Sequence, residues 1–382
     1  MATNKPPTQF PSPPTGLQNA EKPVRDVHGI KWLIAVVTIL TSTFFFAIDN
    51  TIVADIQPAI LNTFGNVEKL PWLGTAFALG GISILPWGKA YGVFNIKWLF
   101  IASTVLFQAG SALCGAAPSM DSLIFGRALA GFGGAGMYNG GLLYLALTTT
   151  PTERSVYMST AVLSWGVGTV LGPVVGGAFA VSRLTWRWAF YINLLIGVVF
   201  APAYFLTLPN IDLQRDTRTT EKMRQMDWIG MVVFFGGMIA FTMALSFGGT
   251  VYSWSSPPEI ILWVAAGLLL IATAAVTIYH PLVPKDSRLY PAHFVRRPIL
   301  VNLQLQTFLL CGINLGTAYY IPLFFQFTAG DDPIGAAVRL LPYICLLVVA
   351  SLFSGGLLPR IRTFAPFYLG GSILIIAGSA TL

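Results

Sequence analysis

The hydrophobic positions of this chain form long runs separated by short polar breaks, from about residue 31 onward. Each run has about 20 residues, the length of an α-helix that crosses the ~30 Å hydrocarbon core of a bilayer. Because the runs are continuously apolar and do not alternate, they favour membrane helices over the strands of a membrane barrel. We therefore predict an all-α polytopic membrane protein. The eleven expected segments cover residues 31–54, 72–91, 97–117, 122–147, 156–181, 188–208, 228–247, 260–279, 300–326, 335–357 and 366–382.

Composition agrees with this prediction. Hydrophobic residues make up 55% of the 382 residues and charged residues only 10%, less than half of the ~25% that is usual in soluble domains. Soluble globular, collagen-like, disordered and disulfide-scaffold proteins are therefore excluded. Residues 1–28 are rich in proline and poor in apolar residues, so we expect a disordered cytoplasmic tail there, without the features of a signal peptide.

Positive charges are distributed unevenly between the two sides of the predicted membrane. The formal net charge is +7, and seventeen of the 22 Lys and Arg residues fall on the side of the N-terminus, whereas three fall on the other side. Arg127 and Arg339 lie inside segments. Cytoplasmic loops carry the excess of Lys and Arg, so we expect a cytoplasmic N-terminus. The spread of these charges over short loops argues against a nucleic-acid partner.

Cysteine and histidine usage predicts no metal site, no cofactor and no catalytic residue. Cys114, Cys311 and Cys345 lie in three separate apolar segments, and we expect three buried, unpaired thiols. The three histidines lie in polar flanks, away from any carboxylate inside the membrane.

The fifth segment contains glycines at a regular helical spacing. Gly168, Gly172 and Gly176 lie on one helix face, where they allow another helix to approach closely, and Pro173 is expected to bend the segment. Three such glycines alone are typical of ordinary helix packing. The full string, which continues to Gly177, resembles the antiporter motif of the major facilitator superfamily.

Further strings resemble the fourteen-helix drug:proton antiporters of that superfamily, of the fungal toxin and multidrug efflux type. These strings are Phe46–Val53 in the first helix, Arg127–Ala135 in the fourth, Trp186–Asn193 at the start of the sixth, Asp227–Gly230 and Ala244–Trp254 in two extra central helices, and Tyr319–Gln326 and Arg339–Pro342 in the second half.

The resemblance implies a division of the chain. It predicts a six-helix N-terminal bundle at 29–208, a cytoplasmic loop at 209–226, two extra central helices at 227–280 and three helices of a C-terminal bundle at 281–382. About eleven of fourteen helices are then present, so we expect a truncated gene model or a fragment, rather than a working eleven-helix transporter, that is inactive or nearly inactive alone.

The resemblance also points to a gating loop after the second helix. The family usually has an acid and a run of basic residues there. In this chain Gly88, Lys89 and Lys97 match the motif, whereas Gly92 stands in place of the acid and Ile96 in place of an arginine.

Two charged residues lie where the membrane tolerates charge least. Asp49 is late in the first segment and Arg127 is early in the fourth, so the predicted topology gives them a similar depth. Arg127 shares a helix face with Gly131 and Ala135, where helices pack closely. We expect an ion pair, which either couples protons to transport or only fixes helix packing. Asp55, past the end of the apolar run, is expected to face water.

The ninth segment carries a polar stripe that predicts a substrate cavity. At about 100° per residue, Asn302, Gln306, Thr317 and Tyr320 fall on one face. Polar groups that faced lipid would lack partners, so this face turns either toward a cavity or toward hydrogen bonds with a neighbouring helix.

These observations predict a proton-coupled efflux transporter that exports small, largely apolar compounds by alternating access, most simply in the plasma membrane. Its expected partners are the small-molecule substrate, protons and the lipid bilayer. One alternative is uptake or vacuolar loading of siderophores, amino acids or other solutes, and another is a non-transporting fragment. A membrane-embedded enzyme is disfavoured because the sequence lacks an acidic metal-binding motif.

Overall fold

The computed structural model describes residues 27–280, 283–284, 288–290, 294–330, 335, 338–339, 341–361, 363 and 365–379. Their regular elements are helices, which confirms the all-α prediction. They are α2 (Ile30–Phe64), a 3₁₀ turn η1 (Val67–Lys69), α3 (Pro71–Gly81), α4 (Ile84–Val93), α5 (Ile96–Ala116), α6 (Met120–Thr148), α7 (Pro151–Val181), α8 (Trp188–Leu206), α9 (Thr219–Arg224), α10 (Trp228–Phe247), α11 (Pro257–Tyr279), α12 (Pro298–Ala329), α14 (Leu341–Ile361) and α15 (Ala365–Ser379).

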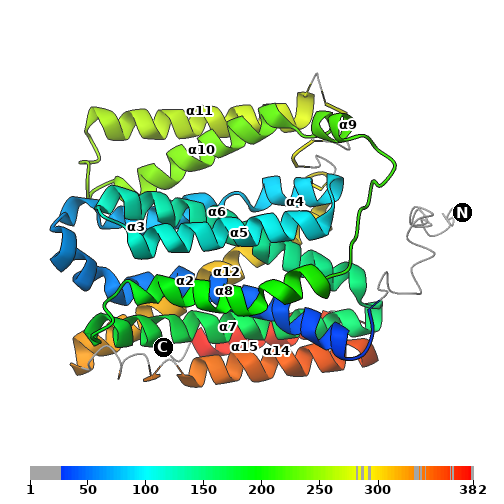
Figure 1. The fold of residues 1–382 in the computed structure, drawn as a ribbon. Coiled ribbons are helices and arrows are strands. Elements are labelled where there is room, and N and C mark those ends of the chain that lie inside the picture. The colour runs from blue at the N-terminus through cyan, green and yellow to red at the C-terminus, as the bar shows by residue number, and fades with distance from the viewer. Residues whose placement is uncertain are drawn as a thin grey trace, which may run out of the picture.

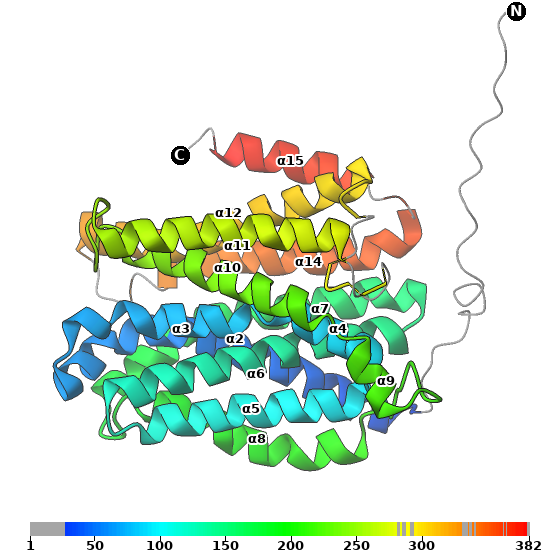
Figure 2. The same cartoon turned by 90° about the horizontal axis from the view of Figure 1, so that it is seen from above.

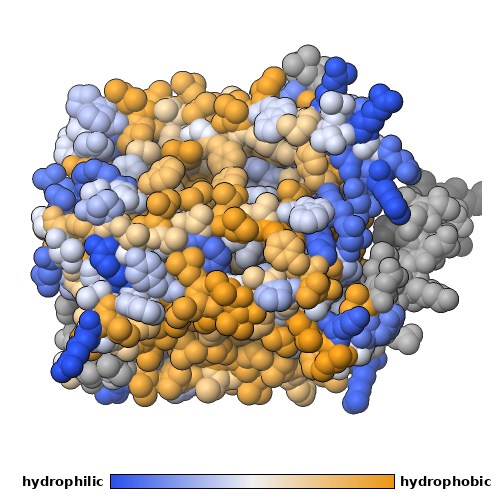
Figure 3. Space-filling model, in the orientation of Figure 1, coloured by the Kyte–Doolittle hydropathy of each residue, from blue (hydrophilic) through white to orange (hydrophobic). Residues whose placement is uncertain are grey.

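The long helices run roughly along one common direction (Figures 1 and 2). Within the described residues, eight helical stretches are long and apolar enough to cross a membrane. The other three expected segments correspond to α6, α12 and α15. Figure 3 shows how polar and apolar residues are distributed on the surface: apolar side chains cover the middle, and polar side chains gather at the two ends. This is the pattern of a chain that lies across a bilayer.

The exposure of the cysteines differs from the prediction. Cys114 is buried as expected, whereas Cys311 on α12 and Cys345 on α14 are exposed. The prediction of three buried thiols is wrong because, in a membrane protein, an apolar run can face the lipid as well as the protein core.

The first helix is longer than its apolar run. α2 continues to Phe64 and ends at Gly65, whose φ of 70° is left-handed, so the expected end at residue 54 is wrong. Asp55 is consequently half-buried within the helix and does not lie in a loop. Asp49, expected near the outer end, lies near the middle of α2.

The second expected segment is interrupted between α3 and α4. The break at residues 82–83 lies four residues before Pro86, which has no N–H to donate to the carbonyl of Ile82. The expected gating loop is also shorter than predicted. Gly88 and Lys89 belong to α4, Lys97 lies in the first turn of α5, and only Phe94 and Asn95 connect the two helices.

Helices α2 to α8 pack around one hydrophobic core that extends from Trp32 to Ile211. α6 is the central helix, and its glycines allow close contacts on two sides. Gly131 lies against the backbone of Phe77 in α3, and Gly133 against the backbone of Phe107 in α5. This packing explains why α6 is poorer in large apolar residues than its neighbours.

Two groups of helices lie outside this core. α10 and α11 form a hairpin that packs against α3, whereas α14 packs against α7. We call the end of the molecule where α2 and α5 begin the basic end. The segment between α8 and α10, which includes the short helix α9, crosses this end (Figure 1).

Candidate functional site

An aspartate and an arginine meet in the core of the helix bundle. Arg127 Nη1 on α6 donates to Asp49 Oδ2 on α2 over 2.5 Å, and Arg127 Nη2 donates to the Asp49 backbone carbonyl over 3.1 Å. Both side chains are buried, with exposed fractions of 0% for Asp49 and 1% for Arg127. The structure therefore brings together the two charged residues that the sequence places at a similar depth.

Helices α3, α5 and α8 also contribute residues to the surroundings of this pair, and α3 contacts Arg127 directly. Arg127 Nε donates to the Leu73 carbonyl of α3 over 3.3 Å. The guanidinium carbon lies 4.1 Å from the ring centroid of Phe77, also on α3. A cation over an aromatic face is attracted by the ring's electron density, more strongly so when it is desolvated. Arg127 is thus held by α3 as well as by Asp49.

Asn193 on α8 contacts the other carboxylate oxygen. Its Nδ2 donates to Asp49 Oδ1 over 3.0 Å and to Ser111 Oγ of α5 over 3.1 Å. Both Asn193 and Ser111 are buried. The Asn193 Oδ1 atom has no hydrogen-bond partner among the described residues. Asn193 belongs to the sixth-helix motif of the sequence, but its contact with Asp49 was not predicted, and Ser111 carries no motif at all.

This arrangement is a neutral cluster with one negative and one positive charge, held by helices α2, α3, α5, α6 and α8. A buried ion pair is strongly destabilised when one partner loses its charge. The cluster can therefore respond to the gain of a proton by Asp49 or to a new partner for Arg127. The described residues contain no group of three or more His, Cys, Asp or Glu side chains that could hold a metal ion.

The glycine motif of α7 packs against the part of α2 that carries Asp49. A Cβ atom at Gly168 would lie 2.6 Å from the Phe44 carbonyl oxygen, and one at Gly176 would lie 2.7 Å from the Ile52 carbonyl oxygen. Gly172 faces Thr51 in the same way. Gly177 differs, because nothing lies within 4 Å of its Cβ position. The first three glycines thus form the contact with α2, and Gly177 does not.

The gating-loop residues lie at the basic end, away from the Asp49 cluster. Lys97 Nζ donates to the Phe205 carbonyl of α8 over 2.6 Å. A Cβ atom at Gly88 would approach Asn139 of α6 to 3.2 Å. Lys89 shares the last turns of α4 with Gly88.

The polar stripe of α12 is spread along the helix. Asn302 and Gln306 are both on the outer surface, where Gln306 Nε2 lies 3.4 Å from Asn302 Oδ1. Gln306 also lines a groove beside α15. Thr317 is half-buried and Tyr320 is 69% exposed. Asn302 and Tyr320 are 18 positions apart, which corresponds to about 27 Å of helix, so these side chains do not form one compact site with Asp49 and Arg127.

Comparisons with known proteins add to this geometry. Residues 39–247 match the family model described as Major Facilitator Superfamily. The chain is 52% identical over 358 residues to the efflux pump DEP3 of Alternaria brassicicola, covering 94% of this chain and 64% of that protein. It is 50% identical over 372 residues to the efflux pump DEP3 of Fusarium langsethiae, with coverages of 97% and 68%. It is 43% identical over 363 residues to the efflux pump patC of Aspergillus clavatus, with coverages of 94% and 66%. The chain therefore spans about two thirds of the length of these curated relatives.

Proposed function

Because this chain belongs to the major facilitator superfamily, we propose that it forms part of a proton-coupled efflux transporter for small, largely apolar compounds. Secondary metabolites, toxins and drugs are the substrate classes that we propose. The relatives in Alternaria, Fusarium and Aspergillus are named efflux pumps, which supports export over uptake. The observation that carries the proposal is the buried contact between Asp49 and Arg127.

In this proposal the Asp49 cluster couples proton binding to substrate binding. A proton on Asp49 removes the charge that attracts Arg127, and a substrate group that attracts the guanidinium weakens the same contact. Both ligands therefore act on the contact between Asp49 and Arg127, and exchange follows when the binding of one disfavours the binding of the other. Asn193 is a positioning residue, because it orients the carboxylate that receives the proton.

Alternating access needs two bundles that move against each other. We propose that residues 29–208 form one bundle, that 281–382 contribute to the other, and that 227–280 are the two extra helices. The contact between α7 and α14 supports this division. Ser155 Oγ of α7 donates to the Gly355 carbonyl of α14 over 3.0 Å, and Val170 packs with Ile344. Because α7 also packs on α2, movement at this interface reaches the helix that carries Asp49.

We further propose that the basic end faces the cytoplasm and that the plasma membrane is the site of action, with the vacuolar membrane as the alternative. The excess of Lys and Arg on the side of the N-terminus supports this orientation. The loop at 209–226, which contains α9, would then be cytoplasmic.

Transport by inside-out vesicles from cells that express this chain within a complete fourteen-helix transporter tests the proposal. A lipophilic dye such as rhodamine 6G should accumulate when the vesicle lumen is acidified, and a protonophore should abolish the accumulation. Vesicles with Asp49→Asn provide the matched control. Accumulation that is unchanged by the protonophore, or equal in Asp49→Asn, would contradict proton coupling through this site.

A further inference from the structure

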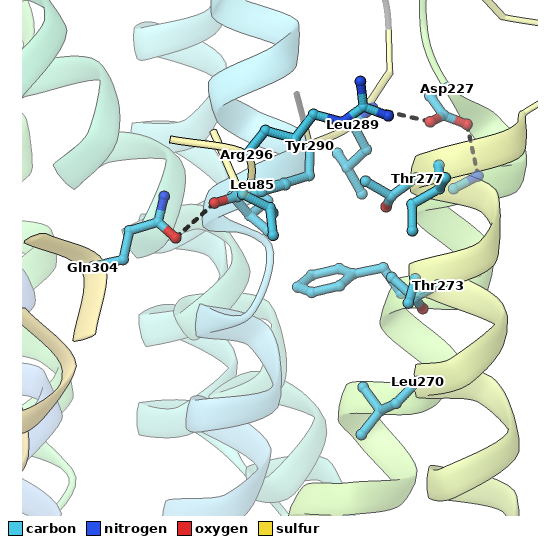
Figure 4. Close-up of a pocket in the computed structure, with 14 residues that line it drawn as sticks. Leu85, Asp227, Leu270, Thr273, Thr277, Leu289, Tyr290, Arg296 and Gln304 are labelled. Atoms are coloured by element: carbon cyan, nitrogen blue, oxygen red, sulfur yellow. Dashed lines mark hydrogen bonds between the residues drawn. The ribbon is translucent and has the colours of Figure 1, made fainter. Parts of the chain in front are cut away.

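A second feature lies outside the core bundle, where a cavity separates the α10–α11 hairpin from α4 (Figure 4). At the opposite end of the hairpin, Trp72 of α3 packs on Phe247 of α10 with ring centroids 4.5 Å apart. Toward the basic end the hairpin and the bundle leave a space of about 600 Å³. This cavity is bounded by α4, α10, α11 and α12 and by the residues that precede α12.

The walls of the cavity are mostly apolar. Leu85 of α4, Phe234 of α10 and Leu270 of α11 line it from three helices; Leu85 and Leu270 are labelled in Figure 4. The lining residues of α11 extend from Leu270 to Ile278, which corresponds to about 12 Å along the helix. The long direction of the cavity is therefore parallel to the helices, which is also the direction of a lipid acyl chain in a bilayer.

Polar groups gather at the basic end of the cavity. The Asp227 carboxylate lies there, but it accepts from the backbone N–H groups of Gly230 and Leu289 over 2.7 and 2.9 Å. Its Oδ1 atom also lies 3.2 Å from His280 Nε2. Tyr290 Oη donates to Gln304 Oε1 over 2.7 Å. The Asp227 carboxylate is therefore buried, and both of its oxygens accept hydrogen bonds from backbone N–H groups of the protein.

Besides Asp227, Arg296 is the charged residue among those that line the cavity. It lines the cavity and is exposed, and no acidic partner is found for it in the part of the chain that the structure describes. Arg288 is engaged in a different way, because its Nη1 donates to the Thr277 and Ile278 carbonyls at the end of α11. The cavity thus combines an apolar slot with one available positive charge at the membrane boundary.

We propose that this cavity binds an anionic phospholipid of the bilayer, with an acyl chain between α4, α10 and α11 and the headgroup phosphate at Arg296. Basic pockets between membrane helices on the cytoplasmic side are suited to such headgroups. The cavity lies outside the Asp49 cluster, so this lipid is distinct from the exported compound. Because the lipid fills the gap between α4 and the hairpin, it fastens the two extra helices to the bundle.

Native mass spectrometry of the detergent-purified chain, titrated separately with phosphatidylserine and phosphatidylcholine, tests this proposal. Arg296→Gln should weaken phosphatidylserine binding about fivefold, the factor equivalent to about 1 kcal/mol per basic residue near an anionic surface, and leave phosphatidylcholine binding unchanged. Arg224→Gln is the matched control, because Arg224 is an exposed arginine of α9 at the same end, and it is not among the residues that line the cavity.

A second pair of variants tests the apolar slot. Ala274 lines the cavity, whereas its neighbour Ala275 is exposed and does not. Ala274→Phe should reduce phosphatidylserine binding, and Ala275→Phe should not. Equal effects of Arg296→Gln and Arg224→Gln would overturn the proposal, because they indicate general surface charge. Loss of dye binding in Ala274→Phe with unchanged phosphatidylserine binding would also overturn it, because the occupant would then be the transported compound.

Discussion

The hydroxyl of Thr51 on α2 donates a hydrogen bond of 2.9 Å to the carbonyl oxygen of Thr169 on α7. That carbonyl lies four residues before Pro173, which has no N–H and cannot supply the usual helix hydrogen bond. A residue of one helix therefore satisfies the acceptor that the proline of another helix leaves open. The contact lies two residues from Asp49, so it ties the glycine motif of α7 to the charged cluster.

Thr51→Val should destabilise the protein, because valine keeps the shape of threonine but leaves the Thr169 carbonyl without its donor. We expect a loss of about 1–3 kcal/mol, the usual cost of an unsatisfied buried polar group. Thr307→Val is the matched control, since the Thr307 hydroxyl is exposed and, among the described residues, bonds to the Leu303 carbonyl within its own helix. Thermal unfolding in detergent measures both, and equal midpoints would contradict the special role of Thr51.

Two glycines of one motif should respond differently to a methyl group. A Cβ atom at Gly172 would collide with Thr51 and the Ile48 carbonyl oxygen, whereas nothing lies near the Cβ position of Gly177. Gly172→Ala should force α2 and α7 apart and lower the yield of folded protein. Gly177→Ala should be neutral or slightly stabilising, by up to about 1 kcal/mol, because alanine favours helices. Size-exclusion profiles and unfolding midpoints of the two variants provide the comparison.

Asp49→Asn should reach the membrane but lose dye accumulation driven by a pH gradient, while some downhill exchange remains. Asparagine keeps the shape of the side chain but cannot bind a proton at this site. Arg127→Lys should also be impaired, because an ammonium group cannot reproduce the planar fork that contacts Asp49, its carbonyl and Leu73.

A purely structural ion pair predicts a different result for these positions. Both single variants would then express poorly, and the exchange of Asp49→Arg with Arg127→Asp would restore expression and transport together. Normal pH-gradient-driven transport by well-expressed Asp49→Asn would rule out the coupling role.

Asn193→Ala should reduce gradient-driven accumulation more than downhill exchange, because it removes the donor that orients Asp49 Oδ1. A hydrogen bond to a charged group contributes about 1.5–3 kcal/mol, so we expect roughly a tenfold effect or more on accumulation. Ser111→Ala should have a smaller effect, since Ser111 contacts Asn193 and not Asp49. Asn139→Ala, which removes a hydrogen bond from α6 to Ile84, is the control for a lost interhelical contact. Equal changes in all three would contradict the positioning role.

Cysteine labelling tests the orientation. After Cys311 and Cys345, which are exposed, are replaced by serine, single cysteines are introduced as Thr220→Cys in the 209–226 loop and Ser253→Cys in the 248–259 loop. An impermeant thiol reagent should label Ser253→Cys in intact cells, and Thr220→Cys only after permeabilisation. The reverse pattern would overturn the orientation that the charge distribution predicts.

The sequence predicts the membrane segments well because hydrophobicity and helix length act along the chain. The end of α2 is not predicted by hydrophobicity, because Asp55, Gln57 and Pro58 interrupt the apolar run but the helix continues through them. Backbone hydrogen bonds continue past polar side chains where a helix extends beyond the hydrocarbon layer. The break before α4 could have been inferred from Pro86, although a proline in the first turn of a helix gives the same signal.

The Asp49 cluster was only partly predictable. The depth of Asp49 and Arg127 follows from topology, so their proximity could be expected from the sequence. The participation of Asn193 and Ser111 depends on how α5 and α8 rotate about their axes, which hydrophobic periodicity does not determine for helices that are apolar on all sides. The stripe of α12 illustrates the same difficulty, because its residues share a face but their neighbours are set by tertiary packing.

Arg127 retains four acceptors or aromatic neighbours besides the Asp49 carboxylate, namely the Asp49 carbonyl, the Leu73 carbonyl and the Phe77 and Phe190 rings. A proton on Asp49 therefore leaves the guanidinium in place, and the cluster changes from neutral to singly positive inside the hydrocarbon layer. An uncompensated charge at that depth interacts with the electric field across the membrane, by up to about 2.3 kcal/mol per 100 mV for a full crossing. For the proposed exchange cycle, the anchoring of Arg127 thus predicts sensitivity to membrane voltage as well as to the pH difference.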